Sequence, residues 1–149
     1  MAIDAAIAGL IPHAGAMCLL ERIEHWDDSS IVLATGSHRD PANPLAGRSG
    51  LRSIHLCEYG AQAMAVHGGL AARARGEHAA TGLLVSIRDV ALHRDFVHDL
   101  EGELRVEARR IHASVSAWQY SFRVTHAGTL IAQGRATVSA APSPGLRGW

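Results

Sequence analysis

Glu58 and Gln62 are the two side chains whose types and spacing best suit proton-transfer chemistry. They are four residues apart, so on a helix they lie on the same face, one turn from each other. The segment that carries them is rich in alanine, and burial on such a helix would raise the pKa of the Glu58 carboxyl group by desolvation. We therefore expect Glu58 to act as a general acid, with Gln62 hydrogen-bonded to its carboxylate or to the group that leaves. The alternative is an exposed helical glutamate that pairs with an arginine.

A general acid of this kind needs a base, and histidine is the usual choice near neutral pH. His55 is the first candidate, because it precedes Glu58 by three residues and would lie beside it on a helix. A carboxylate at that distance would raise the pKa of the imidazole, in which case Glu58 takes the proton and His55 returns one. His38, in the loop before the helix, and His13, near the N-terminus, are the other candidates. For each of the three the alternative is a structural role, and His67 is expected to pack in the core.

Gly50 and Leu51 are expected to open the same helix. The first backbone N–H groups of a helix have no partner within it, and the helix dipole is positive at that end. These two N–H groups are therefore candidates for holding the negatively charged oxygen of a reaction intermediate. The alternative is an ordinary helix start.

Length and composition narrow the class of protein. The 149 residues suit one domain, which we place at residues 1–140, followed by a flexible tail at 141–149. Acidic and basic residues number 14 each, and this balance argues against a nucleic-acid binder. No apolar run approaches the ~20 residues that a membrane span needs. Cys18 and Cys57 form neither a disulfide framework nor a zinc-binding pattern, so we expect a reduced cytoplasm and no metal.

The pattern of apolar and polar residues predicts the elements that must position these side chains. The expected helices are 3–10 and 51–75, the expected strands are 17–25, 31–36, 81–93, 102–111, 117–125 and 129–139, and residues 37–50 form a long loop. A bend is expected near Arg88-Asp89 and a hairpin turn at 126–128. The aromatic residues of one strand, Trp118, Tyr120 and Phe122, are expected in the core, with the lining of a ligand tunnel as the alternative.

Antiparallel strands that follow one long helix indicate an α+β fold. A curved sheet wrapped around that helix would bury its alanine-rich surface, which is the hotdog architecture. The strand near residues 82–92 would then be an exposed edge, and such edges are commonly covered by a second subunit. We therefore expect a homodimer or a dimer-based oligomer.

Three stretches of the chain resemble the 3-hydroxyacyl-[acyl-carrier-protein] dehydratase family. The first runs from Ile11-Pro12-His13 to Ile23, the second is Glu58-Tyr59-Gly60-Ala61-Gln62-Ala63, and the third runs from Asp99 to Gly134. The chain is most similar to the branch associated with aryl-polyene pigment clusters. That branch has N-P-L in the loop, here Asn43-Pro44-Leu45, and E-Y-x-A-Q-A on the helix.

The resemblance implies a function in fatty-acid or polyketide/aryl-polyene type biosynthesis. The expected reaction is the dehydration of a 3-hydroxyacyl thioester of an acyl carrier protein or of CoA, without a cofactor. Glu58 and Gln62 are then catalytic together with a histidine, and His55 is our choice. The N–H groups of Gly50 and Leu51 would hold the thioester oxygen, and the loop residues Asn43 and Pro44 are assigned to substrate binding.

The loop also departs from the family. The main branch has a catalytic histidine 14 residues before its acidic residue, and the corresponding residue of this chain is Pro44. The partner of Glu58 in proton transfer therefore cannot be carried over from the family. Two further functions stay open: a thioesterase of the same fold, in which Glu58 activates water, and a catalytically silent acyl-binding subunit that pairs with an active one.

Overall fold

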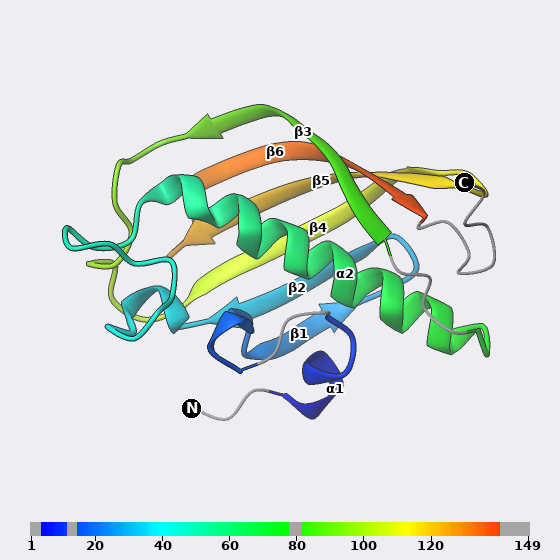
Figure 1. Ribbon diagram of the computed structural model, residues 1–149, viewed down its shortest axis with the longest axis horizontal. Helices are drawn as coiled ribbons and strands as arrows, with labels where there is room; N and C mark the ends of the chain where they lie inside the picture. Colours follow the sequence, from blue (N-terminus) through cyan, green and yellow to red (C-terminus); the bar gives the residue numbers. More distant parts are fainter. Residues whose placement is uncertain (1–3, 12–14, 78–81, 141–149) are drawn as a thin grey trace, which may run out of the picture.

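The computed structural model describes residues 4–11, 15–77 and 82–140 of the chain. His13 and the expected tail at 141–149 lie outside the described residues. A six-stranded antiparallel sheet and one long helix make up most of the described part, with the helix lying along one face of the sheet (Figure 1). This is the α+β hotdog fold that the residue pattern predicts. No described helix is long and apolar enough to cross a membrane.

The strand order across the sheet is β1-β2-β4-β5-β6-β3, and every neighbouring pair is antiparallel. In this order β3 has β6 as its single neighbour and forms one edge of the sheet, and β1 forms the other. The elements are α1 (Ala5–Ala8), η1 (Gly15–Met17), β1 (Arg22–Trp26), β2 (Ser30–Thr35), η2 (Ser37–Arg39), η3 (Ser53–His55), α2 (Leu56–Ala74), β3 (Gly82–Leu92), β4 (Leu104–Ala113), β5 (Ala117–His126) and β6 (Thr129–Ala140), where η is a 3-10 turn.

Small residues bring α2 close to the sheet. A Cβ atom added to Gly60 would lie 2.6 Å from the ring of Phe122 in β5, so only glycine allows this approach. Tyr120 and Phe122 are both buried, and Trp118 packs against the same core. The expected core role of this aromatic row is confirmed, and its rings fill the space between α2 and the sheet.

The long helix begins later than expected. α2 starts at Leu56 rather than Leu51, because residues 51 and 52 run beside the segment around Phe96 and the next three residues form the 3-10 turn η3. Ser53 N–H donates to Asp95 C=O (2.9 Å), and Val97 N–H donates to Leu51 C=O (2.9 Å). The second bond uses the Leu51 C=O, which would accept from the His55 N–H if the helix began at Leu51.

The first strand is also shorter than the expected 17–25. β1 begins at Arg22, because the backbone of Leu19 bonds to side chains rather than to a neighbouring strand. Leu19 N–H donates to Gln62 Oε1 (3.0 Å), and Leu19 C=O accepts from Thr35 Oγ1 (2.6 Å).

Both expected irregularities are present. The bend near Arg88-Asp89 is a bulge in β3, where Asp89 has a φ of 55°. The turn between β5 and β6 has positive φ at Ala127 (47°) and Gly128 (82°), as a two-residue hairpin turn requires.

Candidate active site

Glu58 and Gln62 lie together as the sequence predicts. Glu58 is half-buried in the first turn of α2, and Gln62 is buried one turn further along. Gln62 Nε2 donates to Glu58 Oε1 over 3.1 Å. Of the two roles expected for Gln62, the structure therefore shows the one in which it holds the Glu58 carboxylate.

The orientation of the Gln62 amide is fixed by two backbone groups from one remote segment. Its Oε1 accepts from Leu19 N–H (3.0 Å), and its Nε2 donates to Met17 C=O (2.7 Å) as well as to Glu58. All three bonds are consistent with only one amide orientation, since an exchange of the oxygen and nitrogen would break each of them. The Glu58 carboxylate is thus hydrogen-bonded to an amide group whose own orientation is fixed by the backbone of Met17 and Leu19.

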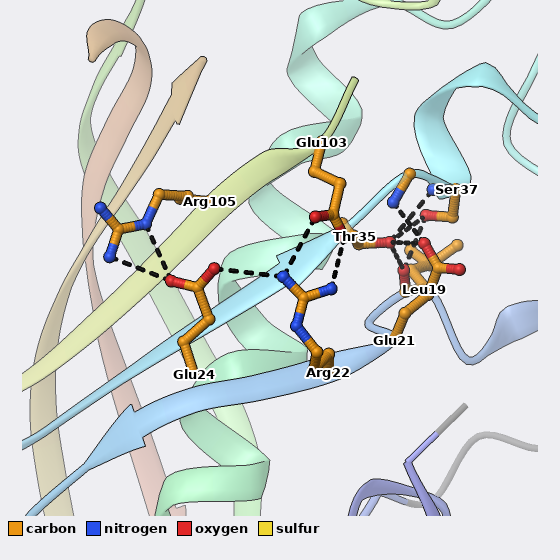
Figure 2. Close-up of polar contacts among 9 residues, drawn as sticks. Leu19, Glu21, Arg22, Glu24, Thr35, Ser37, Glu103 and Arg105 are labelled. Atoms are coloured by element: carbon orange, nitrogen blue, oxygen red, sulfur yellow. Dashed lines mark hydrogen bonds and ion pairs between the residues drawn. The ribbon is translucent and has the colours of Figure 1, made fainter. Parts of the chain in front are cut away.

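Polar contacts continue from Leu19 into the loop that precedes α2. Leu19 C=O also accepts from Ser37 Oγ (2.7 Å), and Thr35 and Glu21 lie in the same group of contacts (Figure 2). Ser37 Oγ lies 2.9 Å from the hydroxyl of Tyr59, the residue after Glu58. Burial raises the pKa of this Tyr59 hydroxyl, so it stays neutral near pH 7. The network ties the loop to α2 beside the candidate acid.

Asn43 belongs to this network. Its Nδ2 donates to Ser37 C=O (2.9 Å) and to the Tyr59 hydroxyl (3.0 Å), and its Oδ1 accepts from Leu45 N–H (2.9 Å). The side chain therefore shapes the loop, whereas the next residue, Pro44, is exposed. The expected role of both residues in substrate binding remains a prediction.

A surface cavity of about 390 Å³ opens beside this loop. Its lining includes Cys18, Leu19, Glu21, Ser37, Arg39 and Asn43. The volume falls within the range of small-molecule sites. A ligand in this cavity could therefore reach Leu19, Ser37 and Asn43 of the network, whereas Glu58 and Gln62 do not line it.

The N–H groups of Gly50 and Leu51 already have partners. Gly50 N–H donates to Gly47 C=O (3.1 Å), and Leu51 N–H donates to His98 Nδ1 (3.1 Å). The helix also begins five residues after Leu51, at Leu56. The expectation that these two groups open the helix is wrong, and their role in holding a thioester oxygen has no support from this geometry.

His98 is a structural partner that the sequence reasoning missed. Gly50 has a φ of +111°, and a Cβ atom there would lie 2.1 Å from the His98 ring. The His98 ring meets that of Phe96 edge to face at 5.6 Å, and the Arg52 guanidinium lies 4.8 Å from the centre of the Phe96 ring. The only local signal was Gly50 itself, because its partners lie in a loop more than 40 residues away in the sequence.

His38 is fully buried in η2. Its Nε2 lies 2.8 Å from Leu100 C=O and therefore donates, while its Nδ1 has no hydrogen-bond partner among the described residues. Burial lowers the pKa of this imidazole, so near neutral pH it carries its single ring proton on Nε2. His38 thus joins η2 to the loop after β3.

His55 and His67, the other two histidines considered from the sequence, differ in their surroundings. His55 is half-buried at the end of the turn η3, which immediately precedes α2, and it is three residues before Glu58 in the sequence. His67 is buried, with Nδ1 2.8 Å from the Tyr120 hydroxyl and Nε2 2.9 Å from Asp27 C=O. The expected packing role of His67 is confirmed. No group of three or more potential metal ligands occurs among the described residues.

This fold and the Glu58–Gln62 pair place the chain among the hotdog-fold proteins that include dehydratases and thioesterases. Within that class the chain belongs to the ApeP-like dehydratase family, since the family model, described as ApeP dehydratase, matches residues 5–145. Its function is therefore dehydratase-like, and the corresponding enzyme class is a lyase. No curated protein matches the chain significantly.

Solved structures agree with the fold. A chain of the dehydratase heterocomplex ApeI:P from Xenorhabdus doucetiae superposes with a TM-score of 0.81 at 21% identity, covering 92% of this chain and 91% of that one. AziG from S. sahachiroi gives 0.63 at 18% identity, with 90% and 99% covered. A hypothetical thioesterase with coenzyme A from Streptococcus pneumoniae gives 0.61 at 13% identity, with 82% and 86% covered. At these identities the likeness shows the hotdog fold alone.

Proposed function

We propose that this chain is the glutamate-bearing subunit of a dehydratase for 3-hydroxyacyl thioesters, carried by an acyl carrier protein or by CoA. The observation that carries the proposal is the Glu58 carboxylate held by Gln62 at the start of α2. In the reaction a base takes the proton next to the thioester carbonyl, and protonated Glu58 donates to the 3-hydroxyl group. The carbon–oxygen bond breaks, water leaves, and a carbon–carbon double bond forms.

The base in this proposal comes from a second hotdog subunit. Pro44 lies where the main branch has its loop histidine. His38 is buried, and this burial lowers the pKa of its imidazole, which makes it a weaker base. The similarity to a chain of a dehydratase heterocomplex supports a division of the two roles between subunits. The alternative is a base from this chain itself, and His55 is then the candidate.

The β3 edge is the surface that would receive the second subunit. Leu83, Leu84 and Val85 in β3 are 53%, 47% and 62% exposed, which is high for large apolar side chains in a strand. An exposed edge with apolar side chains favours pairing with another strand. Self-association, the assembly expected from the sequence, would use the same edge and stays a prediction. A cytoplasmic location also stays a prediction.

Mass spectrometry of a carrier protein loaded with a 3-hydroxyacyl chain tests the function. The chain is incubated with this substrate alone and after co-purification with a hotdog subunit that has the loop histidine and whose own helix glutamate is changed to glutamine, and that second subunit is also assayed alone. We expect loss of one water molecule only in the presence of both subunits. Dehydration by this chain alone contradicts the division of roles, release of the whole acyl group indicates a thioesterase, and no change with both subunits indicates a silent subunit.

A further inference from the structure

The outer face of the sheet, opposite α2, has two electrostatically different halves. On the half formed by β1, β2 and β4, the arginines are paired with glutamates. Arg22 bonds to Glu103 at 2.8 Å, and Arg105 bonds to Glu24 at 3.0 Å (Figure 2). The charges on this half therefore largely cancel.

The half formed by β5, β6 and β3 carries three arginines: Arg88, Arg123 and Arg135. All three are exposed, whereas Phe122 and Ala136, their neighbours in β5 and β6, are buried. Because side chains alternate along a strand, the arginines lie on the outer face. We call Arg88, Arg123 and Arg135 the arginine patch.

Strand register brings the patch together. Arg88 of β3 lies directly opposite Arg135 of β6. Arg135 in turn lies opposite Ser121 of β5, so that Arg123, two residues further along β5, is its diagonal neighbour. Like charges directly opposite each other across two strands are destabilising.

Among the described residues, no ion pair links a carboxylate to the patch. Every Asp and Glu of the sequence lies in the described residues, and no ion pair joins any of them to the three arginines. Glu107 lies opposite Arg123 in the register, but its ion-pair contact is with Arg109, at 4.0 Å. Asp89 follows Arg88 but sits in the bulge with a φ of 55°.

Arg88 stands on the free edge of the sheet. A strand added there would lie ~4.8 Å away, so one of its outward side chains would directly face Arg88. Outside the bulges of β3, a second copy of this chain offers no acidic side chain for that place. The outward residues of β3 outside its bulges are Leu83, Ser86, Arg88 and Ala91. Self-pairing would also put a second arginine patch on the same continuous face.

We propose that the arginine patch selects the partner at the β3 edge: a different hotdog subunit with an acidic outward residue on its own edge strand, in preference to a second copy of this chain. The inference rests on the proposed function for the existence of a second subunit, and it adds what recognises that subunit. Charge complementarity across the new strand pair would attract the partner, and like charges would disfavour self-pairing.

In the test, an Arg88→Glu variant of this chain takes the place of the acidic partner. Wild-type chain, isotopically labelled to mark its mass, is mixed with unlabelled Arg88→Glu chain, and the dimers are counted by native mass spectrometry. At equal mixing the statistical share of the mixed dimer is half of all dimers. We expect the ratio of the mixed dimer to the geometric mean of the two homodimers to exceed its statistical value by about two- to five-fold, the effect of one cross-strand charge pair. The excess should shrink between about 0.05 and 0.5 M salt, because exposed charges are screened.

Arg73→Glu is the matched control. Arg73 is an exposed arginine near the end of α2, so its reversal makes the same change in net charge away from the edge, and its mixed dimers should form in the statistical share. A statistical share for Arg88→Glu, or the absence of any mixed dimer, overturns the inference. Because this mixture needs neither substrate nor a second subunit, its outcome is separate from that of the dehydration assay.

Discussion

The Nε2 atom of Gln62 lies 3.1 Å from Oε1 of Glu58, one helical turn away, and the same amide is bound to the backbone of Met17 and Leu19. The bonds to Met17 and Leu19 join α2 to the segment that enters β1. Glu58 therefore has a fixed hydrogen-bond donor at its carboxylate before any substrate arrives.

Replacing Gln62 by leucine should impair both stability and turnover. The change leaves the buried Leu19 N–H and the half-buried Met17 C=O without their partner, which costs about 1–3 kcal/mol in the free energy of unfolding. Turnover should fall more than KM rises, because Glu58 loses the group that positions it. Urea denaturation and steady-state kinetics check this. Gln119→Leu, at an exposed position of β5, is the control and should change neither quantity appreciably. Unchanged stability in Gln62→Leu would contradict the bonding described here.

Two glycines of α2 should respond in opposite directions to alanine. Gly60→Ala places a Cβ atom 2.6 Å from the Phe122 ring and should lower the free energy of unfolding by about 1–3 kcal/mol. Gly68→Ala meets nothing within 4 Å and should raise that free energy by up to about 1 kcal/mol. Thermal unfolding of the pair measures the difference. Equal effects would mean that Gly60 does not set the distance between α2 and β5.

Stability should fall with acidification in part because of His67. Burial lowers the pKa of this imidazole below its ordinary value of 6.5. The unfolded chain therefore binds the proton more readily, so the stability from this group is complete above the unfolded pKa and is lost as the pH falls below it. Between about pH 7 and about pH 5, the free energy of unfolding should fall less in His67→Gln than in wild type. An equal fall in the two proteins would be evidence against this role. Some dependence should remain in the variant, since burial also lowers the pKa of His38.

Alanine variants of His55 and His38 distinguish a base supplied by the second subunit from a base in this chain. With a second subunit supplying it, His55→Ala should keep most of the dehydratase rate and the same pH profile. His38→Ala should lose about 1–3 kcal/mol of stability, because Leu100 C=O loses its buried donor, while turnover of the folded protein persists. Kinetics against pH on the two-subunit enzyme, together with denaturation curves, give both readouts. A His55→Ala variant that is inactive and folded would place the base in this chain.

Local pattern was enough to predict most of the fold. Strict alternation in β4 and β5 identified those strands, and the glycine at 128 after His126-Ala127 identified the turn between β5 and β6. The start of α2 was misplaced, because Leu51–Ser53 pair with residues 95–97 across a long loop. No pattern within one segment can reveal a contact of that kind.

The candidate site was predictable only in part for the same reason. The spacing of Glu58 and Gln62 was sufficient to place them together, because a helix fixes the relation between residues four apart. What orients Gln62 is a backbone segment 43 and 45 residues away, and what holds His38 is a carbonyl 62 residues away. The partner of the Leu51 N–H likewise comes from a distant loop, at His98.

Complementation measures the central claim, that Glu58 supplies the acid to a site shared with another subunit. The second subunit carries the loop histidine, but its own helix glutamate is changed to glutamine, so that it is inactive alone. Co-purified with wild-type chain, it should remove water from a carrier-bound 3-hydroxyacyl group. Co-purified with Glu58→Gln, it should lose at least about ten-fold in rate, or ~1.4 kcal/mol in barrier, while the complex stays folded. Glu77→Gln, at an exposed position after α2, should keep the wild-type rate. A folded Glu58→Gln complex that retains more than about a tenth of the wild-type rate would contradict the account.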